Sequence, residues 1–326
     1  MLKRVIYNCP FVPPEWVAAH GLQPSRIRPE ERIDAAPKAG LCSYAHSFLK
    51  TALAQKPDAI ILSTRCDQMR RLTDSQTDRL AIPVFMFNVP ATWQTTDARK
   101  LYSSELRRLG RFLEKLGGRS PSKKCLSEEI AKWDHNRKKL CEARRANSAS
   151  HFSELLESFH RSGGKLPDKL IQKKVSPKGV SLGVIGGPLL AGRENILRVT
   201  ELAGGQIVFD GTEDSERTLP DMLRAEKLQK SPFEELVHIY FDTIPDVFRR
   251  PDTALHEWLR RMITMHKPRG LVLSHFVWCD LWRAQISRMR EWSGLPILSI
   301  DLSADSGEGA KQRIRTRLEA FLEELA

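Results

Sequence analysis

Four cysteines lie where a predicted strand or loop gives way to a predicted helix, a setting that favours thiolate chemistry. They are Cys9, Cys42, Cys66 and Cys279. Backbone N–H groups and the positive end of the helix dipole favour a thiolate there, so we expect the pKa of each thiol to be lowered. Thiolates at this wide spacing suit an iron–sulfur cluster or zinc, and no compact ferredoxin-type or C-x-x-C spacing selects between the two. For any single cysteine, a small buried hydrophobic residue is an equally good interpretation.

Two of these cysteines occupy equivalent places in an internal repeat. Residues 56–91 and 267–303 each read Lys-Pro, a short apolar run, a Cys-Asp pair, a helical stretch, and a second apolar run. The Pro that opens this last run lies 17 residues after Cys66 in the first copy and after Cys279 in the second. Each copy predicts a βαβ unit with its Cys-Asp at the carboxyl end of a strand, where open parallel sheets bind ligands. Two such units predict one cofactor held between two related domains.

Other polar residues are candidates for proton transfer. They are Glu15, His46, His275 and Asp301, of which Glu15 and His46 are the predicted catalytic residues. Carboxyl and imidazole groups do this work where their surroundings tune the pKa toward neutrality. Acids and histidines at strand ends are more often structural, and this alternative stays open for each.

Two further features adjoin predicted helix starts. Asp67 and Asp280, each directly after its cysteine, are expected to cap the helices that follow. Gly186-Gly187-Pro188 follows an apolar run and could cradle a phosphate at a helix start. It lacks the complete dinucleotide-binding or Walker pattern, so a plain tight turn is the more common explanation.

The order of apolar runs and amphipathic stretches predicts an α/β protein with two doubly wound parallel sheets and a helical connector. We place an N-terminal α/β domain at residues 1–119, the connector at 120–177 and a C-terminal α/β domain at 178–326. The predicted helices include residues 43–54, 95–116, 193–202, 232–241, 253–266 and 311–325. A strand is predicted at 206–209, with Asp210 at its tip.

Composition bounds the function classes. The 326 residues carry a net charge of +12, and 41% of them are hydrophobic, as in an ordinary globular protein. No apolar run is long enough for a membrane span or a signal peptide, so we expect a cytoplasmic protein and no membrane partner. The basic residues are scattered rather than gathered in a stripe with aromatics, which argues against nucleic acid. The charge equally suits an anionic small molecule or an acidic protein. Six cysteines without a secretion signal do not indicate a disulfide framework.

Taken in order, short motifs along the chain resemble the 2-hydroxyacyl-CoA dehydratase and benzoyl-CoA reductase family. The N-terminal ones are Pro13-x-Glu15 with Ala18-x-x-Gly21, Cys42-Ser43-Tyr44, Cys66-Asp67, and Val89-Pro90 with Tyr102-x-x-Glu105-Leu106. The C-terminal ones are Gly186-Gly187-Pro188, Phe276-x-x-Cys279-Asp280, Pro296-Ile297-Leu298-Ser299-Ile300-Asp301, and Arg313-x-x-Thr316-Arg317-x-x-Ala320-Phe321. Each motif is weak alone, and together they are fairly specific.

The resemblance implies two Rossmann- or flavodoxin-like domains with a [4Fe-4S] cluster at their interface. Its usual three ligands correspond to Cys42, Cys66 and Cys279, and Cys9 would be a fourth ligand or a neighbour. Such proteins work as dimers of related subunits on an acyl-CoA substrate, and an ATP-hydrolysing iron–sulfur activator supplies one electron at low potential. The implied reaction is dehydration of a 2-hydroxyacyl-CoA or reduction of an acyl-CoA.

Three alternatives remain open. Cys9, as Cys-x-x-x-Pro13-x-Glu15, is similar to a branch of the family that carries a double-cubane cluster and reduces small molecules. If that cluster needs six thiolates, Cys125 and Cys141 would have to supply two. The chain could instead be a non-catalytic partner of a catalytic homologue, or a zinc-binding structural protein.

Overall fold

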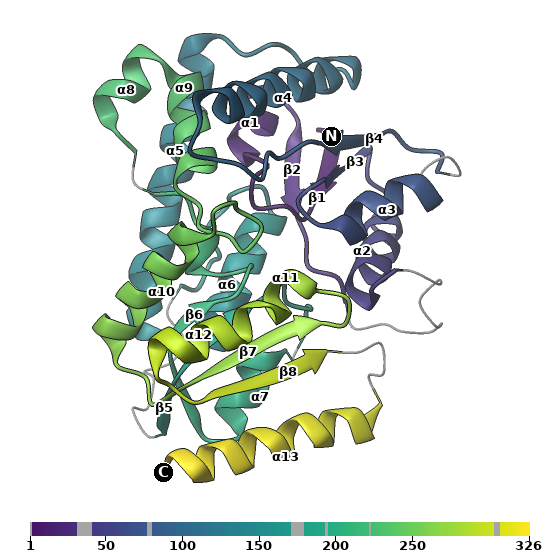
Figure 1. Ribbon diagram of the computed structural model, residues 1–326. Coiled ribbons are helices and arrows are strands. Elements are labelled where there is room, and N and C mark those ends of the chain that lie inside the picture. The colour runs from purple at the N-terminus through teal and green to yellow at the C-terminus, as the bar shows by residue number, and fades with distance from the viewer. Residues whose placement is uncertain are drawn as a thin grey trace.

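The computed structural model describes residues 2–30, 41–76, 80–170, 179–192, 195–221, 223–302 and 307–326, with positions 74–76 described by their backbone alone. Two four-stranded parallel sheets form its centre (Figure 1). The first sheet consists of β1 (Arg4–Tyr7), β2 (Gln23–Arg26), β3 (Ala59–Ser63) and β4 (Val84–Phe87). The second consists of β5 (Val180–Gly186), β6 (Gly205–Gly211), β7 (Gly270–Phe276) and β8 (Ile297–Leu302). The predicted α/β class with two parallel sheets is confirmed.

The two sheets share one topology. Their orders are β2-β1-β3-β4 and β6-β5-β7-β8, so β3 and β7 occupy equivalent inner places. Every residue of these two strands is buried, as expected for parallel strands that helices cover on both faces. Lys56 and Lys267, which each precede a Pro before the strand, both take the left-handed backbone conformation, with φ of 48° and 45°. The internal repeat seen in the sequence is therefore a structural repeat.

Helices surround both sheets. In the N-terminal half they are α1 (Pro14–Ala19), α2 (Ser43–Ala54), α3 (Asp67–Gln76) and α4 (Thr96–Lys115). The connector holds α5 (Lys123–Glu142), a 3₁₀ turn at Ala143–Ala146, and α6 (Ala149–Arg161). The C-terminal half begins with α7 (Ile196–Leu202), a 3₁₀ turn at Glu216–Thr218 and α8 (Ala225–Lys230). Next come α9 (Pro232–Val237), which continues into a π turn at His238–Asp242, and α10 (Thr253–His266). The last helices are α11 (Asp280–Arg283), α12 (Gln285–Ser293) and α13 (Glu308–Leu325).

Some predicted boundaries are wrong in detail. The strand predicted at 206–209 extends from Gly205 to Gly211, so Asp210 lies inside it. The helix predicted at 232–241 changes at His238 into a π turn. The final helix begins at Glu308 rather than at 311. The helix predicted at 193–202 begins at Ile196, where Asn195 caps it, and residues 193–194 lie outside the described part of the chain. The helices predicted at 43–54 and 253–266 are confirmed to the residue.

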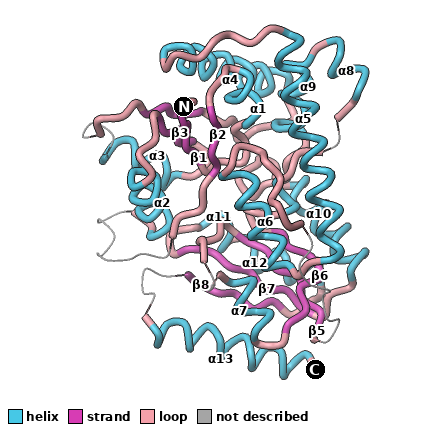
Figure 2. Tube along the Cα trace, turned by 180° about the vertical axis from the view of Figure 1, so that it is seen from behind, coloured by secondary structure: helices cyan, strands magenta, loops and turns pink. Residues whose placement is uncertain are grey.

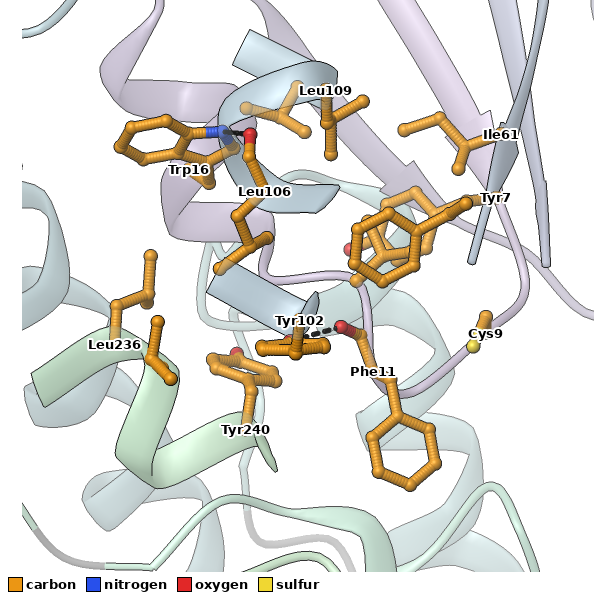
Figure 3. Close-up of a cluster of buried hydrophobic side chains, with 14 of the residues drawn as sticks. Tyr7, Cys9, Phe11, Trp16, Ile61, Tyr102, Leu106, Leu109, Leu236 and Tyr240 are labelled. Carbon is orange, nitrogen blue, oxygen red and sulfur yellow. Dashed lines mark hydrogen bonds between the residues drawn. The ribbon is translucent and has the colours of Figure 1, made fainter. Parts of the chain in front are cut away.

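The N-terminal core includes a segment from the C-terminal half. Leu236 of α9 and Tyr240 of the π turn pack with Tyr102 and Leu106 of α4 in one buried cluster (Figure 3). Two hydrogen bonds fix α4 in this cluster, from the Tyr102 hydroxyl to the Phe11 carbonyl (2.6 Å) and from Trp16 Nε1 to the Leu106 carbonyl (2.9 Å). The predicted boundaries at 119 and 177 stay a prediction, because packing crosses between the two halves of the sequence.

The connector joins the two sheets directly. Helix α6 packs against β2 of the first sheet and β6 of the second, and it lies between the sheets in the view from behind (Figure 2). The Ser25 hydroxyl donates to the Arg161 carbonyl at 2.9 Å, and Arg144 Nη2 donates to the Ile207 carbonyl at 3.3 Å. The connector therefore holds the two sheets in a fixed relation. None of the helices that the structure describes is long and apolar enough to cross a membrane.

Candidate metal and cofactor centre

A cavity of about 920 Å³ is lined by residues from both halves of the chain, and three cysteines are among them. Cys42 immediately precedes α2, Cys66 lies between β3 and α3, and Cys279 lies between β7 and α11. Because β3 and β7 are equivalent strands, the repeat delivers Cys66 and Cys279 from equivalent loops. The structure thus brings together three of the four predicted ligands, in a crevice beyond the carboxyl ends of strands.

Local hydrogen bonds hold the loops that carry these thiols. The Cys42 N–H donates to Gln68 Oε1 at 2.7 Å, which joins the start of α2 to α3. Cys42 Sγ accepts the Ala45 N–H at 3.4 Å, so this sulfur caps its helix. The Cys279 N–H donates to the Phe276 carbonyl at 2.9 Å, in a turn where Trp278 takes a left-handed conformation with φ of 76°.

Burial controls the acidity of the thiols. It raises the pKa of Cys42 and of Cys279 to about 12, and it also raises the pKa of Cys66 and of Cys9. Backbone N–H groups oppose this shift at all four sulfurs, in the sense expected from their positions, but desolvation outweighs them. The expectation of lowered thiol pKa values is therefore wrong. Negative charge on Cys66 also raises the pKa of Cys42 and of Cys279, so the three sulfurs share one electrostatic environment.

A buried ionic network crosses the cavity wall. Arg65, directly before Cys66, pairs with Glu213 and with Asp246 (3.0 Å), both from the C-terminal half. Arg217 also pairs with Asp246 at 3.1 Å. The two arginines hold the pKa of Asp246 down to about 2 despite its burial, whereas burial raises the pKa of Glu213. Arg65 lowers the pKa of the Cys66 thiol, so it stabilises negative charge at the site.

The donor set fits an iron–sulfur cluster better than a single ion. Across the described ranges of the chain, no three His, Cys, Asp or Glu side chains lie close enough together to hold one metal ion. A single zinc ion needs sulfur ligands at about 2.3 Å, and therefore in mutual contact. A cluster places iron and sulfide between its thiolates and tolerates wider spacing. Three cysteines on separate loops around one cavity agree with the soft ligands of such a cluster.

The fourth predicted ligand, Cys9, is buried in the N-terminal core. Cys9 is 1% exposed, belongs to the N-terminal core and does not line the cavity (Figure 3). A hydrogen bond with Ser63, the last residue of β3, and the charge of Arg65 both lower its pKa, against the larger effect of burial. Cys9 is thus electrostatically linked to the site through Arg65. Cys125 and Cys141 lie on α5 and are not part of the cavity lining.

The two predicted catalytic residues are not among those that line the cavity. Glu15 is fully buried on α1, where it pairs with Arg137 of α5 and accepts a hydrogen bond from the Tyr240 hydroxyl at 2.8 Å. Its carboxylate joins three elements of the N-terminal core. His46 lies in the first turn of α2, half-buried. Catalytic roles for Glu15 and His46 stay predictions.

Other polar residues named from the sequence pair with neighbouring side chains or lie at helix starts. His275 of β7 pairs with Asp301 of β8 at 3.1 Å, opposite each other in the sheet. Asp67 is the first residue of α3 and bonds to Arg70 and Arg71, and Asp280 is the first residue of α11. The expected capping role is wrong for Asp280, because Cys279 holds the cap position of α11, and both aspartates lie in the first turns of their helices.

Gly186 is the last residue of β5, and the chain bends at Gly187 directly after it. Gly186 has φ of 145°, and a side chain there would meet the Ser274 carbonyl oxygen at 1.9 Å. The Gly187 N–H already donates to that carbonyl at 3.1 Å, and α7 begins only at Ile196. These contacts argue against the phosphate cradle, and the tight turn stays a prediction.

Sequence reasoning missed the polar residues that complete the cavity wall, namely Asn8, Arg65 and Glu213. A signal was present, since each comes one or two residues after a strand end, where parallel sheets place their ligands. The pairing of Arg65 with Glu213, which lie far apart in the sequence, leaves no local pattern.

Two parallel α/β sheets in a repeated arrangement, with thiols from equivalent loops around a shared crevice, define a two-domain α/β protein with a cofactor-sized thiol site. The family model described as 2-hydroxyglutaryl-CoA dehydratase, D-component, matches residues 9–325, and the chain belongs to this family. The resemblance seen in the sequence is thereby confirmed. A search of individually curated proteins finds no match.

Proposed function

We propose that the chain is the iron–sulfur subunit of a low-potential, ATP-activated acyl-CoA dehydratase or reductase, with a [4Fe-4S] cluster held by Cys42, Cys66 and Cys279. Membership of the dehydratase family makes it a dehydratase-type subunit. The observation that carries the proposal is the convergence of these three thiols, from three separate loops, on one cavity of about 920 Å³.

When bound, such a cluster would supply one-electron transfer at low potential. The chain's own residues would prepare its binding. The Ala45 N–H bonds to the Cys42 sulfur, and further backbone N–H groups near Cys66 and Cys279 favour their thiolates. Such hydrogen bonds, together with burial, tune the potential of a sulfur-ligated metal site. The neutral thiols must lose protons on binding, because only the thiolate is a metal ligand.

The same cavity is large enough for a substrate. Ligand sites of drug-sized molecules span roughly 300–1,000 Å³, and this cavity lies near the top of that range. We propose an acyl-CoA thioester as the occupant, in keeping with the family description. The net charge of +12 suits the coenzyme phosphates or an acidic protein partner.

A D-component implies a second subunit in the dehydratase system. We propose that this subunit is a homologue of the chain and that an ATP-dependent iron–sulfur activator delivers the electron. The second candidate function is a non-catalytic subunit that only shapes the active site of its partner. It predicts a bound cluster but no turnover until the partner is added.

The double-cubane alternative would need further thiolates. Cys9 is one candidate, because its thiol interacts with Arg65, which lines the cavity, and with Ser63, the last residue of β3. Cys141 is exposed on α5, and neither it nor Cys125 lines the cavity. The structure therefore gives more support to one cubane than to two.

Anaerobic purification followed by iron and sulfide analysis tests the proposal. We expect about four irons per chain, lost in both Cys66→Ser and Cys279→Ser. Cys141→Ser is the matched control, since this thiol lies outside the cavity, and it should keep the full iron content. About eight irons would favour the double cubane. No iron after anaerobic reconstitution, or iron content that ignores both cavity cysteines, would refute the cluster.

A further inference from the structure

A cavity of about 460 Å³ lies apart from the thiol site and shares none of its lining residues. Helix α9 packs against both α4 and α5, and residues of these three helices line the cavity (Figure 1). The cavity therefore lies where a segment from the C-terminal half meets the N-terminal helices. Its volume is within the range of small-molecule sites, roughly 300–1,000 Å³.

The charged part of this lining is mainly positive. Arg107, Lys123 and Lys230 all contribute to it, and within the described part of the chain none of the three forms an ion pair. Glu234 is the acid among the lining residues, and it pairs with Arg99 at 3.7 Å. The cavity thus carries a local excess of positive charge, which attracts an anion.

Arg107 is held in a geometry that suits an oxyanion. Its guanidinium lies over the Phe233 ring, 4.6 Å from the centroid, and it donates no hydrogen bond to any residue that the structure describes. Trp16 packs against the same ring, with 5.2 Å between the ring centroids. Stacking on an aromatic face fixes the plane of a guanidinium but leaves the donors at its edge free. Such a fork binds phosphate or carboxylate oxygens in pairs.

The neutral polar groups of the lining can donate as well. The Ser122 hydroxyl oxygen accepts the Cys125 N–H at 3.1 Å, which leaves its own hydrogen available. Ser231 directly precedes α9, and its side chain caps no backbone N–H there. Trp16 and Leu126 add apolar surface to the same cavity. A matching occupant therefore joins an acceptor-rich anionic group to an apolar body.

A phosphoryl group fits these donors better than a carboxylate does. It carries a charge of about −1.5 to −2 at neutral pH and has three acceptor oxygens. It can therefore meet the fork of Arg107 and the two lysines together. A carboxylate has two oxygens and one charge, so it would leave part of the positive charge unbalanced.

We propose that this cavity binds a phosphorylated small molecule whose apolar body packs against Trp16 and Phe233. The site is separate from the thiol cavity, and the inference does not depend on the proposed function. Phe233 belongs to α9, whose residue Leu236 packs in the N-terminal core. An occupant would bridge these packed helices and stabilise the folded chain, as any ligand of the native state does.

Phenyl phosphate is a suitable probe, with phenyl sulfate and inorganic phosphate for comparison. Phenyl sulfate has nearly the same shape but a single negative charge, and inorganic phosphate lacks the ring. Calorimetry on the purified wild-type chain should show phenyl phosphate binding about threefold to tenfold more tightly than phenyl sulfate. It should bind about tenfold more tightly than inorganic phosphate, because burial of the ring removes apolar surface from water.

Arg107→Gln removes the guanidinium fork, and because this side chain is exposed the fold should be kept. We expect phenyl phosphate to bind about tenfold more weakly to this variant, and about threefold more weakly to Lys123→Gln. Arg111→Gln is the matched control, since Arg111 is also an exposed arginine of α4 but does not line the cavity. Arg70→Gln removes an exposed cation of the thiol cavity instead. Both controls should bind phenyl phosphate within about twofold of the wild type.

Four results would overturn the site. No binding of phenyl phosphate to the wild type at millimolar concentration is the first. Equal binding of all three probes would show that neither the ring nor the second charge is recognised. Equal weakening in Arg107→Gln and Arg111→Gln would indicate general attraction to a basic surface. Weakening in Arg70→Gln alone would assign the phosphate to the thiol cavity.

Discussion

The buried ion pair between Glu15 and Arg137 gives a prediction that separates a structural role from a catalytic one. Glu15 is fully buried and Arg137 is 5% exposed, and among the residues that the structure describes Tyr240 supplies a further hydrogen bond to the Glu15 carboxylate. Arg137→Met removes the positive charge and keeps most of the side-chain volume. The carboxylate then remains buried with only the tyrosine hydroxyl as a partner.

Breaking one side of a buried pair costs about 3–5 kcal/mol, because the remaining charge is left uncompensated. We expect Arg137→Met to lower the free energy of unfolding by roughly that amount, measured by urea denaturation under reducing conditions. The double variant with Glu15→Leu should recover much of the loss, since replacing a whole buried pair by apolar residues is often close to neutral. The coupling between the two substitutions should therefore be large and favourable.

Lys100→Met is the matched control for loss of a positive charge. Lys100 pairs with Asp97 on the exposed face of α4, and an exposed pair contributes at most about 1 kcal/mol. A loss under about 1 kcal/mol for Arg137→Met, or simple additivity in the double variant, would refute the structural role. Loss of turnover in a stable Glu15→Gln protein, by contrast, would support the predicted catalytic role.

The remaining predictions concern Gly186 and the loss of unfolding free energy at low pH. Gly186→Ala should destabilise the protein by roughly 2–5 kcal/mol, because its Cβ would meet the Ser274 carbonyl oxygen at 1.9 Å with φ at 145°. Gly294→Ala, at φ of 65° with open space around it, should cost only about 1 kcal/mol, and equal losses in urea denaturation would contradict the steric argument. The pKa of Asp246 is depressed to about 2, so its ionised form contributes about 2 kcal/mol of stability above pH ~4 that is lost as the pH falls toward ~2. Asp246→Asn should therefore flatten the fall in unfolding free energy between those pH values, and an unchanged slope would show that the carboxylate is not the group responsible.

Much of the architecture can be predicted from the sequence because local residue patterns encode it. The two repeat copies each predict a strand, a loop with Cys-Asp and a second strand. Both predicted units are present in the structure. Helices 43–54 and 253–266 are bounded by residues that start or stop a helix, so their ends are predicted correctly. The equivalent placement of Cys66 and Cys279 after β3 and β7 follows from the repeat, whereas their convergence with Cys42 depends on how the two sheets pack.

The features that sequence reasoning missed depend on distant partners. Glu15 looks like an available acid until Arg137 is placed beside it, 122 residues further along the chain. Thiol acidity was misjudged for a similar reason, because helix-start geometry is local whereas burial is a property of the whole fold. The packing of Leu236 and Tyr240 into the N-terminal core likewise has no local signature.

The repeat also explains why the site is asymmetric. Helix α2 precedes β3 as α10 precedes β7, and the cap positions of these two helices are held by Cys42 and by Asp252. Asp252 does not line the cavity, since its carboxylate is bound to Arg288 and to Gln285. Two thiols therefore come from equivalent loops, and the third comes from the N-terminal half alone.

That asymmetry leaves the C-terminal half free to supply a different kind of group. The C-terminal half instead contributes Glu213, two residues after β6, and this side chain pairs with Arg65 of the N-terminal half. The cavity lining thus combines three sulfur atoms with a buried acid, an amide and a guanidinium. The lining therefore offers polar groups beside the thiols, as the proposed site for a cofactor and a polar substrate requires.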